Sequence, residues 1–69
     1  NCVAPGFIDT SLTRRMLTSD QIEKLTAQVP VGRLGDSVEI ANLVLWLSSP
    51  KNTFVTGQNI AIDGGFTRV

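Results

Sequence analysis

The chain has 69 residues, of which 42% are hydrophobic, with six basic and six acidic residues, one cysteine and no histidine. The balanced charge excludes a basic surface for nucleic acid, since such binding depends on clustered Lys and Arg. One cysteine without histidine also excludes a disulfide framework and a Cys/His metal site. A chain this short buries only about 60% of its unfolded surface, so we expect this apolar sequence to complete its core against further protein.

We expect no membrane-spanning segment, because the longest apolar run, residues 43–47, is far too short to cross a bilayer. No signal peptide is recognised at Asn1. The lone Cys2 is compatible with a reducing compartment. We therefore expect a cytoplasmic protein whose partners include neither a membrane nor a nucleic acid.

The first residues, 1–4, are typical of the end of a buried strand. Pro5 and Gly6 then predict a type II turn, in which the glycine adopts a positive φ. In open α/β sheets, ligands bind at the carboxyl ends of parallel strands. Two interpretations stay open: a bare turn, or a bend whose backbone N–H groups and Thr10 hydroxyl meet an amide or a phosphate.

The stretch after Asp9 is polar with scattered apolar residues and predicts a short helix or a mobile loop. Thr18 and Gln21 then form a capping-box pattern, which predicts the start of a second helix. Apolar residues recur at helical spacing over about two to three turns. Pro30 ends this helix, because the residue before a proline avoids the helical region.

A loop over residues 31–35 leads to a second capping pattern, Asp36 with Glu39. The helix that follows, over residues 37–48, is apolar nearly all round, which predicts burial on more than one side. Residues 59–63 predict a short strand closed by two glycines. The order strand, helix, helix, strand indicates a crossover between parallel strands.

Three single residues have both a functional and a structural interpretation. Arg33 is a surface charge or the partner of a carboxylate, and Trp46 is a core or interface residue. Asp63 is interpreted as a strand-end cap rather than a lone catalytic acid. The chain has neither histidine nor tyrosine, and no glycine-rich phosphate loop. We therefore assign no catalytic or metal-binding residue and expect the 69-residue chain alone to be inactive.

Three ordered blocks, "NCVAPGFIDT", "PVGRLGDSVEIANLVLWLSS" and "FVTGQNIAIDGG", resemble the C-terminal quarter of the short-chain dehydrogenases/reductases. Within that family the sequence is most similar to the 3-oxoacyl-[acyl-carrier-protein] reductases. The resemblance implies an α/β fold, with residues 1–69 forming the C-terminal part of a single Rossmann-type, doubly wound parallel sheet. This part would supply the last two strands and the helices between them, and is incomplete on its own.

The resemblance also implies a cofactor site at the opening bend. Pro5 and Gly6 would end a strand at the nicotinamide end of the cofactor, the backbone of Ile8 would contact the carboxamide, and Thr10 would place its hydroxyl near the carboxamide and pyrophosphate. The family's glycine-rich loop, catalytic serine and Tyr-x-x-x-Lys pair would lie before Asn1. The implied segments are 1–8 (strand end and cofactor turn), 9–29 (substrate lid), 36–49 (buried helix) and 59–63 (last strand).

The implied function is a part of an NAD(P)-dependent oxidoreductase that reduces a carbonyl group, with a 3-oxoacyl thioester as the leading substrate. NADP is favoured over NAD by the resemblance alone. The implied partners are a small-molecule or acyl-carrier-bound substrate and further copies of the chain, which pair through the helix over 37–48 and the strand over 59–63. Two alternatives remain: a dehydrogenase for a sugar, steroid or other alcohol, and a non-catalytic binding or assembly fragment.

Overall fold

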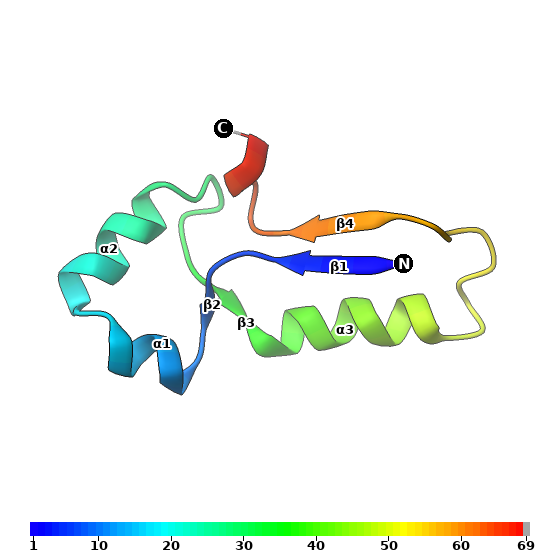
Figure 1. Cartoon of the computed structure of the whole chain (residues 1–69), viewed down its shortest axis with the longest axis horizontal. Helices are drawn as coiled ribbons and strands as arrows, with labels where there is room; N and C mark the ends of the chain where they lie inside the picture. The colour runs from blue at the N-terminus through cyan, green and yellow to red at the C-terminus, as the bar shows by residue number, and fades with distance from the viewer. Residues whose placement is uncertain (69) are drawn as a thin grey trace.

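Two parallel strands, β1 (Cys2–Pro5) and β4 (Asn59–Ile62), lie side by side at the centre of the protein (Figure 1). The computed structural model describes residues 1–68. The register of the pair places Ala4 opposite Ala61. All the helical segments between the strands belong to the connection that joins them, as a parallel pair requires. The predicted parallel crossover is therefore confirmed.

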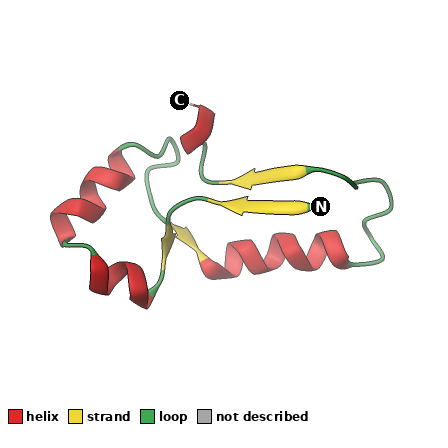
Figure 2. Ribbon diagram, viewed as in Figure 1, coloured by secondary structure: helices red, strands yellow, loops and turns green. Residues whose placement is uncertain are grey.

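The helical segments are α1 (Ser11–Met16), α2 (Ser19–Ala27), α3 (Ser37–Ser48) and the 3-10 turn η1 (Phe66–Arg68). In Figure 2, α3 runs along the β1 side of the strand pair. The two shorter helices, α1 and α2, form an arm beyond the carboxyl ends of the strands. This arrangement makes the molecule thin and elongated, with extents of 43 × 26 × 15 Å.

Both predicted capping boxes are present and begin α2 and α3. The Thr18 hydroxyl accepts a hydrogen bond from the Gln21 N–H at 3.2 Å, and the Gln21 side chain accepts from the Thr18 N–H at 2.8 Å. At α3, the Glu39 carboxylate accepts from the Asp36 N–H at 3.0 Å. Each box satisfies two backbone donors that a helix start otherwise leaves without a partner. These local bonds explain why both helices begin where the sequence predicts.

The predicted type II turn at Pro5 and Gly6 is wrong. Within residues 1–68 the positive φ angles occur at Gly32, Gly57, Gly64 and Gly65, and not at Gly6. Gly6 instead extends the β1–β4 ladder by one residue, because its N–H donates to the Ile62 carbonyl at 3.1 Å. A Cβ at Gly6 would lie 2.6 Å from the Asp63 Cβ and 2.8 Å from its Cα. Close approach of the backbone, and not a positive φ, therefore requires glycine at this position.

A second parallel pair, β2 (Ile8–Asp9) with β3 (Gly35–Asp36), was not predicted, because residues 31–35 were expected to form a loop. It pairs Ile8 with Gly35, and the Gly35 N–H donates to the Phe7 carbonyl at 2.9 Å. A strand of two residues has no alternation of apolar and polar side chains, so periodicity cannot reveal it.

The last strand ends at Ile62, one residue before the predicted end, because Asp63 begins the turn that follows. The Asp63 carboxylate accepts hydrogen bonds from the Gly65 N–H at 2.9 Å and from the Thr67 hydroxyl at 2.8 Å. These bonds lower the pKa of Asp63, with the Thr67 hydroxyl as the largest cause. The interpretation of Asp63 as a strand-end cap is therefore confirmed.

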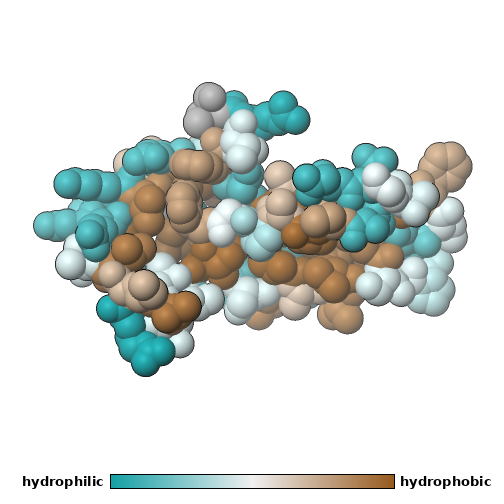
Figure 3. Space-filling model, viewed as in Figure 1, coloured by the Kyte–Doolittle hydropathy of each residue, from teal (hydrophilic) through white to brown (hydrophobic). Residues whose placement is uncertain are grey.

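The buried core contributed by residues 1–68 is very small. Its buried apolar residues are Val29, 5% exposed, and Leu34, 8% exposed. By contrast α3 has no buried residue, with Leu45 67% and Trp46 44% exposed. Figure 3 shows apolar residues gathered over α3 and beside the α1–α2 arm. The burial predicted for residues 36–49 therefore needs protein surfaces from outside this chain and stays a prediction. Among residues 1–68 no helix has the length and apolar character needed to cross a membrane.

Replacing Gly6 by alanine in the complete protein is expected to lower the free energy of unfolding by about 1–3 kcal/mol, the usual cost of overpacking. The added Cβ meets the backbone of Asp63, which cannot move without breaking the β1–β4 ladder. Urea unfolding measures the loss. The control is Gly57→Asn, since nothing lies within 4 Å of a Cβ there and asparagine tolerates a positive φ. Equal losses in the two variants would contradict the crowding argument.

Candidate functional site

A hollow of about 530 Å³ opens at the carboxyl end of β1, between the strand end and the α1–α2 arm. This volume lies within the range of about 300–1,000 Å³ that is usual for ligand sites. Its lining brings together Gly6, Phe7, Ile8, Thr10, Leu12, Thr13, Met16, Leu17 and Leu25. Three of the predicted site residues, Gly6, Ile8 and Thr10, therefore share one cavity. The fourth, Pro5, ends β1 opposite Ile62 and does not line the hollow.

A chain of hydroxyl hydrogen bonds fixes the polar side of the hollow. The Thr13 hydroxyl donates to the Ile8 carbonyl at 2.8 Å and lies 3.1 Å from the Thr10 hydroxyl. Because Thr13 gives its single hydroxyl proton to Ile8, the Thr10 O–H is the donor in the bond between the two hydroxyls. The Thr10 oxygen also accepts from the Thr13 N–H at 3.3 Å, as the N-cap of α1. Thr10 thus keeps one lone pair, and offers an external ligand an acceptor.

Sequence reasoning missed Thr13. Its hydroxyl donates to the carbonyl of Ile8, five residues earlier, and so joins α1 to that residue. This bond also makes the Thr10 hydroxyl the donor in its bond to Thr13. The signal available in the sequence was a threonine three residues after a helix-capping threonine. That spacing places the second side chain on the same side of the helix start as the cap.

Among residues 1–68, none of those that line the hollow is ionisable. The nearby Arg14 is held by Asp9 through two bonds of 2.8 Å each. The hydrogen bond from Arg14 lowers the pKa of Asp9, and the same bond raises the pKa of Arg14. Apart from the backbone, the polar groups of this lining are the hydroxyls of Thr10 and Thr13. A phosphate group finds no cation among the lining residues.

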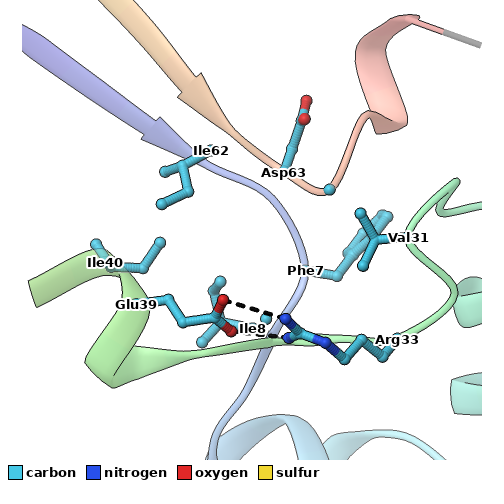
Figure 4. Close-up of a pocket in the computed structure, with 10 residues that line it drawn as sticks. Phe7, Ile8, Val31, Arg33, Glu39, Ile40, Ile62 and Asp63 are labelled. Atoms are coloured by element: carbon cyan, nitrogen blue, oxygen red, sulfur yellow. Dashed lines mark hydrogen bonds and ion pairs between the residues drawn. The ribbon is translucent and has the colours of Figure 1, made fainter. Parts of the chain in front are cut away.

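A smaller cavity of about 100 Å³ also borders Phe7 and Ile8, and its remaining walls include Arg33, Glu39 and Ile62 (Figure 4). Two hydrogen bonds join the Arg33 guanidinium to the Glu39 carboxylate at its edge, at 2.8 and 3.2 Å. The role of Arg33 as the partner of a carboxylate is therefore confirmed. The bonds from Arg33 and from the Asp36 N–H lower the pKa of Glu39 to about 2.

The fold is a parallel α/β unit with a hollow at the carboxyl ends of its strands, where ligands usually bind in open α/β sheets. Residues 1–67 match the profile of a protein family described as enoyl-(acyl carrier protein) reductase. The chain is 48% identical over 69 residues to the 3-oxoacyl-[acyl-carrier-protein] reductase of Escherichia coli, and 43% identical over 68 residues to a tropinone reductase homologue of Arabidopsis thaliana.

Among solved structures, a short-chain dehydrogenase/reductase from Brucella melitensis, titled a glucose/ribitol dehydrogenase, superposes with a TM-score of 0.81 at 39% identity and covers 93% of the chain. The chain belongs to the short-chain dehydrogenase/reductase family. It spans only 28% of the Escherichia coli reductase and 26% of the Brucella melitensis chain. The predicted fold class, a part of a Rossmann-type sheet, is therefore confirmed.

The ion pair of Glu39 predicts a pH-dependent stability for the complete protein. Its folded pKa of about 2 lies below the ordinary 4.5, so its stabilising contribution is full above pH 4.5 and is lost as the pH falls toward 2. Wild type should therefore exceed Glu39→Gln slightly in free energy of unfolding at neutral pH, since the pair is exposed, and this small difference should shrink below pH 4.5.

Urea unfolding at a series of pH values checks this expectation. Glu23→Gln controls for the removal of one carboxylate, since Glu23 makes no ion pair within the described part of the chain. A difference between wild type and Glu39→Gln that stays constant as the solution is acidified would show that the ion pair does not stabilise the fold.

Proposed function

We propose that this chain forms the nicotinamide end of the active site in an NAD(P)-dependent oxidoreductase that reduces a carbonyl group. One observation carries the proposal: the uncharged hollow that joins Gly6, Ile8 and Thr10 to the apolar sides of α1 and α2. Membership of the short-chain dehydrogenase/reductase family supports the use of a nicotinamide cofactor. When bound, the cofactor supplies the hydride.

The residues at the bend are assigned the task of orienting the nicotinamide ring. The backbone of Ile8 is proposed to contact the carboxamide, and the Thr10 oxygen to accept from its N–H₂ group. Pro5 and Gly6 end β1 and direct the chain toward the hollow. The proton donor for the reduced carbonyl is proposed to lie outside these 69 residues, which contain no histidine or tyrosine.

Residues 9–29 are proposed to form the lid over the substrate. Leu12, Met16 and Leu25 line the hollow from α1 and α2, and Met16 is 73% exposed in the chain alone. Such a surface can cover an apolar acyl chain and exclude water from the site of hydride transfer. These side chains are unbranched or branched beyond Cβ, and therefore adapt readily to the shape of a bound substrate.

A 3-oxoacyl thioester on an acyl-carrier protein is the proposed substrate, supported by the name of the Escherichia coli relative at 48% identity. NADP is the proposed cofactor form on the same resemblance. The tropinone reductase homologue and the glucose/ribitol dehydrogenase support a second candidate, the reduction of a different small ketone or sugar. A cytoplasmic location is proposed from the sequence alone.

A homo-oligomer is also proposed, formed through α3 and β4. Helix α3 exposes apolar side chains, among them Val44 at 44%, Leu45 at 67% and Trp46 at 44%. The rest of the sheet in the complete protein can cover one side of such a helix. A second copy of the protein around a two-fold axis would cover the remainder.

Thr10→Ala in the complete protein is expected to raise the Kd for NADPH about fivefold, the effect of one lost hydrogen bond of ~1 kcal/mol. The cofactor would lose the acceptor for its carboxamide N–H₂ group. Fluorescence titration with NADPH and NADH gives the Kd values. Turnover with a 3-oxoacyl thioester, followed by the loss of reduced-cofactor absorbance, gives the effect on the reaction.

Two further variants separate cofactor binding from helix capping. Thr26→Ala is the control, because that hydroxyl donates within α2 to the Glu23 carbonyl at 2.8 Å and does not line the hollow. Thr10→Gly keeps most of the N-cap stability but removes the side-chain oxygen. If Thr10→Ala loses affinity and Thr10→Gly binds like wild type, Thr10 acts only as a helix cap and its assignment to the cofactor is wrong.

Trp46→Asp in the complete protein is expected to split the oligomer into smaller species, because the contact would then bury an unpaired charge. Light scattering at micromolar concentration measures the mass before and after the change. Lys51→Asp, which alters charge in the exposed loop after α3, is the control. A wild-type protein that is already monomeric under these conditions would refute the assembly.

A further inference from the structure

The position of Ile8 depends on a very short ladder. Strands β2 and β3 pair over two residues only, with Ile8 opposite Gly35. The Gly35 N–H donates to the Phe7 carbonyl at 2.9 Å. Even an isolated two-stranded hairpin of ordinary length is marginal in water, so a ladder of two residues needs support from outside its own hydrogen bonds.

That support comes from the side chains of Arg33 and Glu39, which lie on either side of β3 in the sequence (Figure 4). The guanidinium binds both carboxylate oxygens and also donates to the Leu34 carbonyl at 3.1 Å. The same carboxylate accepts the Asp36 N–H at 3.0 Å. One Glu39 side chain, at the start of α3, therefore links Arg33, two residues before β3, to Asp36 within it. Two-point bonds between guanidinium and carboxylate fix direction as well as distance.

Strand β3 also lies close to Ile8. The Gly35 backbone is joined to the Phe7 carbonyl, and a Cβ added to Gly35 would lie 2.9 Å from Cδ1 at the end of the Ile8 side chain. On its other side, the Ile8 carbonyl accepts the Thr13 hydroxyl at 2.8 Å. Ile8 is therefore held between β3 and α1, and a displacement of β3 moves it. Ile8 also lines the hollow, so the displacement reaches the proposed cofactor site.

We propose that Arg33 and Glu39 are a positioning pair, which holds β3 against β2 and thereby fixes Ile8 at the nicotinamide end of the site. The inference rests on the proposed function, since it assigns Ile8 to the cofactor. Both side chains are more than two-fifths exposed, at 57% and 44%. Exposed ion pairs contribute little to global stability, so variants of the pair are expected to fold. Their effect falls on the geometry of β3.

The test uses the complete protein with Arg33→Met, and Lys51→Met as the control for a lost surface cation. In the absence of cofactor, amide exchange at Gly35 should accelerate about tenfold, because local opening of β3 becomes easier. The Kd for NADPH should rise about tenfold, because a displaced Ile8 backbone no longer meets the carboxamide with good hydrogen-bond geometry. The midpoint of urea unfolding should fall only slightly, as in Glu39→Gln at neutral pH, because an exposed ion pair contributes little to global stability.

Two more variants test the ion pair itself. Glu39→Gln retains a side chain able to cap the Asp36 N–H but loses the ion pair, and should match Arg33→Met. The double variant should show no further loss, since both changes remove one interaction. A double variant that loses affinity well beyond either single change would overturn the proposal.

The remaining outcomes separate this inference from the proposed function. Unchanged Gly35 exchange in Arg33→Met overturns the positioning role outright. Faster exchange with unchanged NADPH affinity, in a protein whose Thr10→Ala variant binds weakly, overturns the link to Ile8 and leaves the proposed function intact. A wild-type protein that binds neither NADPH nor NADH refutes the proposed function, and the positioning role with it.

Discussion

The parallel pairing of β1 with β4 is the constraint on which the rest of the structure depends. Its register brings Pro5 opposite Ile62 and places the Gly6 backbone directly against Asp63. The chain leaving β1 must therefore pass close to the turn that follows β4, where only a glycine fits. From that point it enters β2 and reaches the hollow at Ile8. The site is thus located by a backbone contact between the two ends of the chain.

The chemistry of the hollow follows from a few hydroxyl groups on an apolar surface. Thr13 gives its proton to the Ile8 carbonyl, which makes Thr10 the donor to Thr13 and leaves its oxygen as an acceptor. None of the described residues that line the cavity carries a charge, so its polar character comes from these hydroxyl groups. The polarity of the site is consequently decided by hydrogen-bond direction rather than by a charged residue.

The small buried core sets the stability of the chain. Only Val29 and Leu34 are buried apolar residues within residues 1–68, although 42% of the sequence is hydrophobic. The exposed side chains of α3 and of the α1–α2 arm represent hydrophobic stabilisation that the chain cannot gain from its own contacts. This agrees with a chain that spans about a quarter of the length of its relatives.

The sequence by itself determined the features that depend on residues a few positions apart. Both capping boxes, the cap at Asp63 and the parallel crossover follow from local spacing and element order. The family resemblance added the grouping of Gly6, Ile8 and Thr10 near one strand end. Only the tertiary structure decided why Gly6 is a glycine, that β2 pairs with β3, and that Thr13 controls Thr10. The physical reason is that steric contact between distant segments, and the direction of a shared proton, leave no periodic pattern in the sequence.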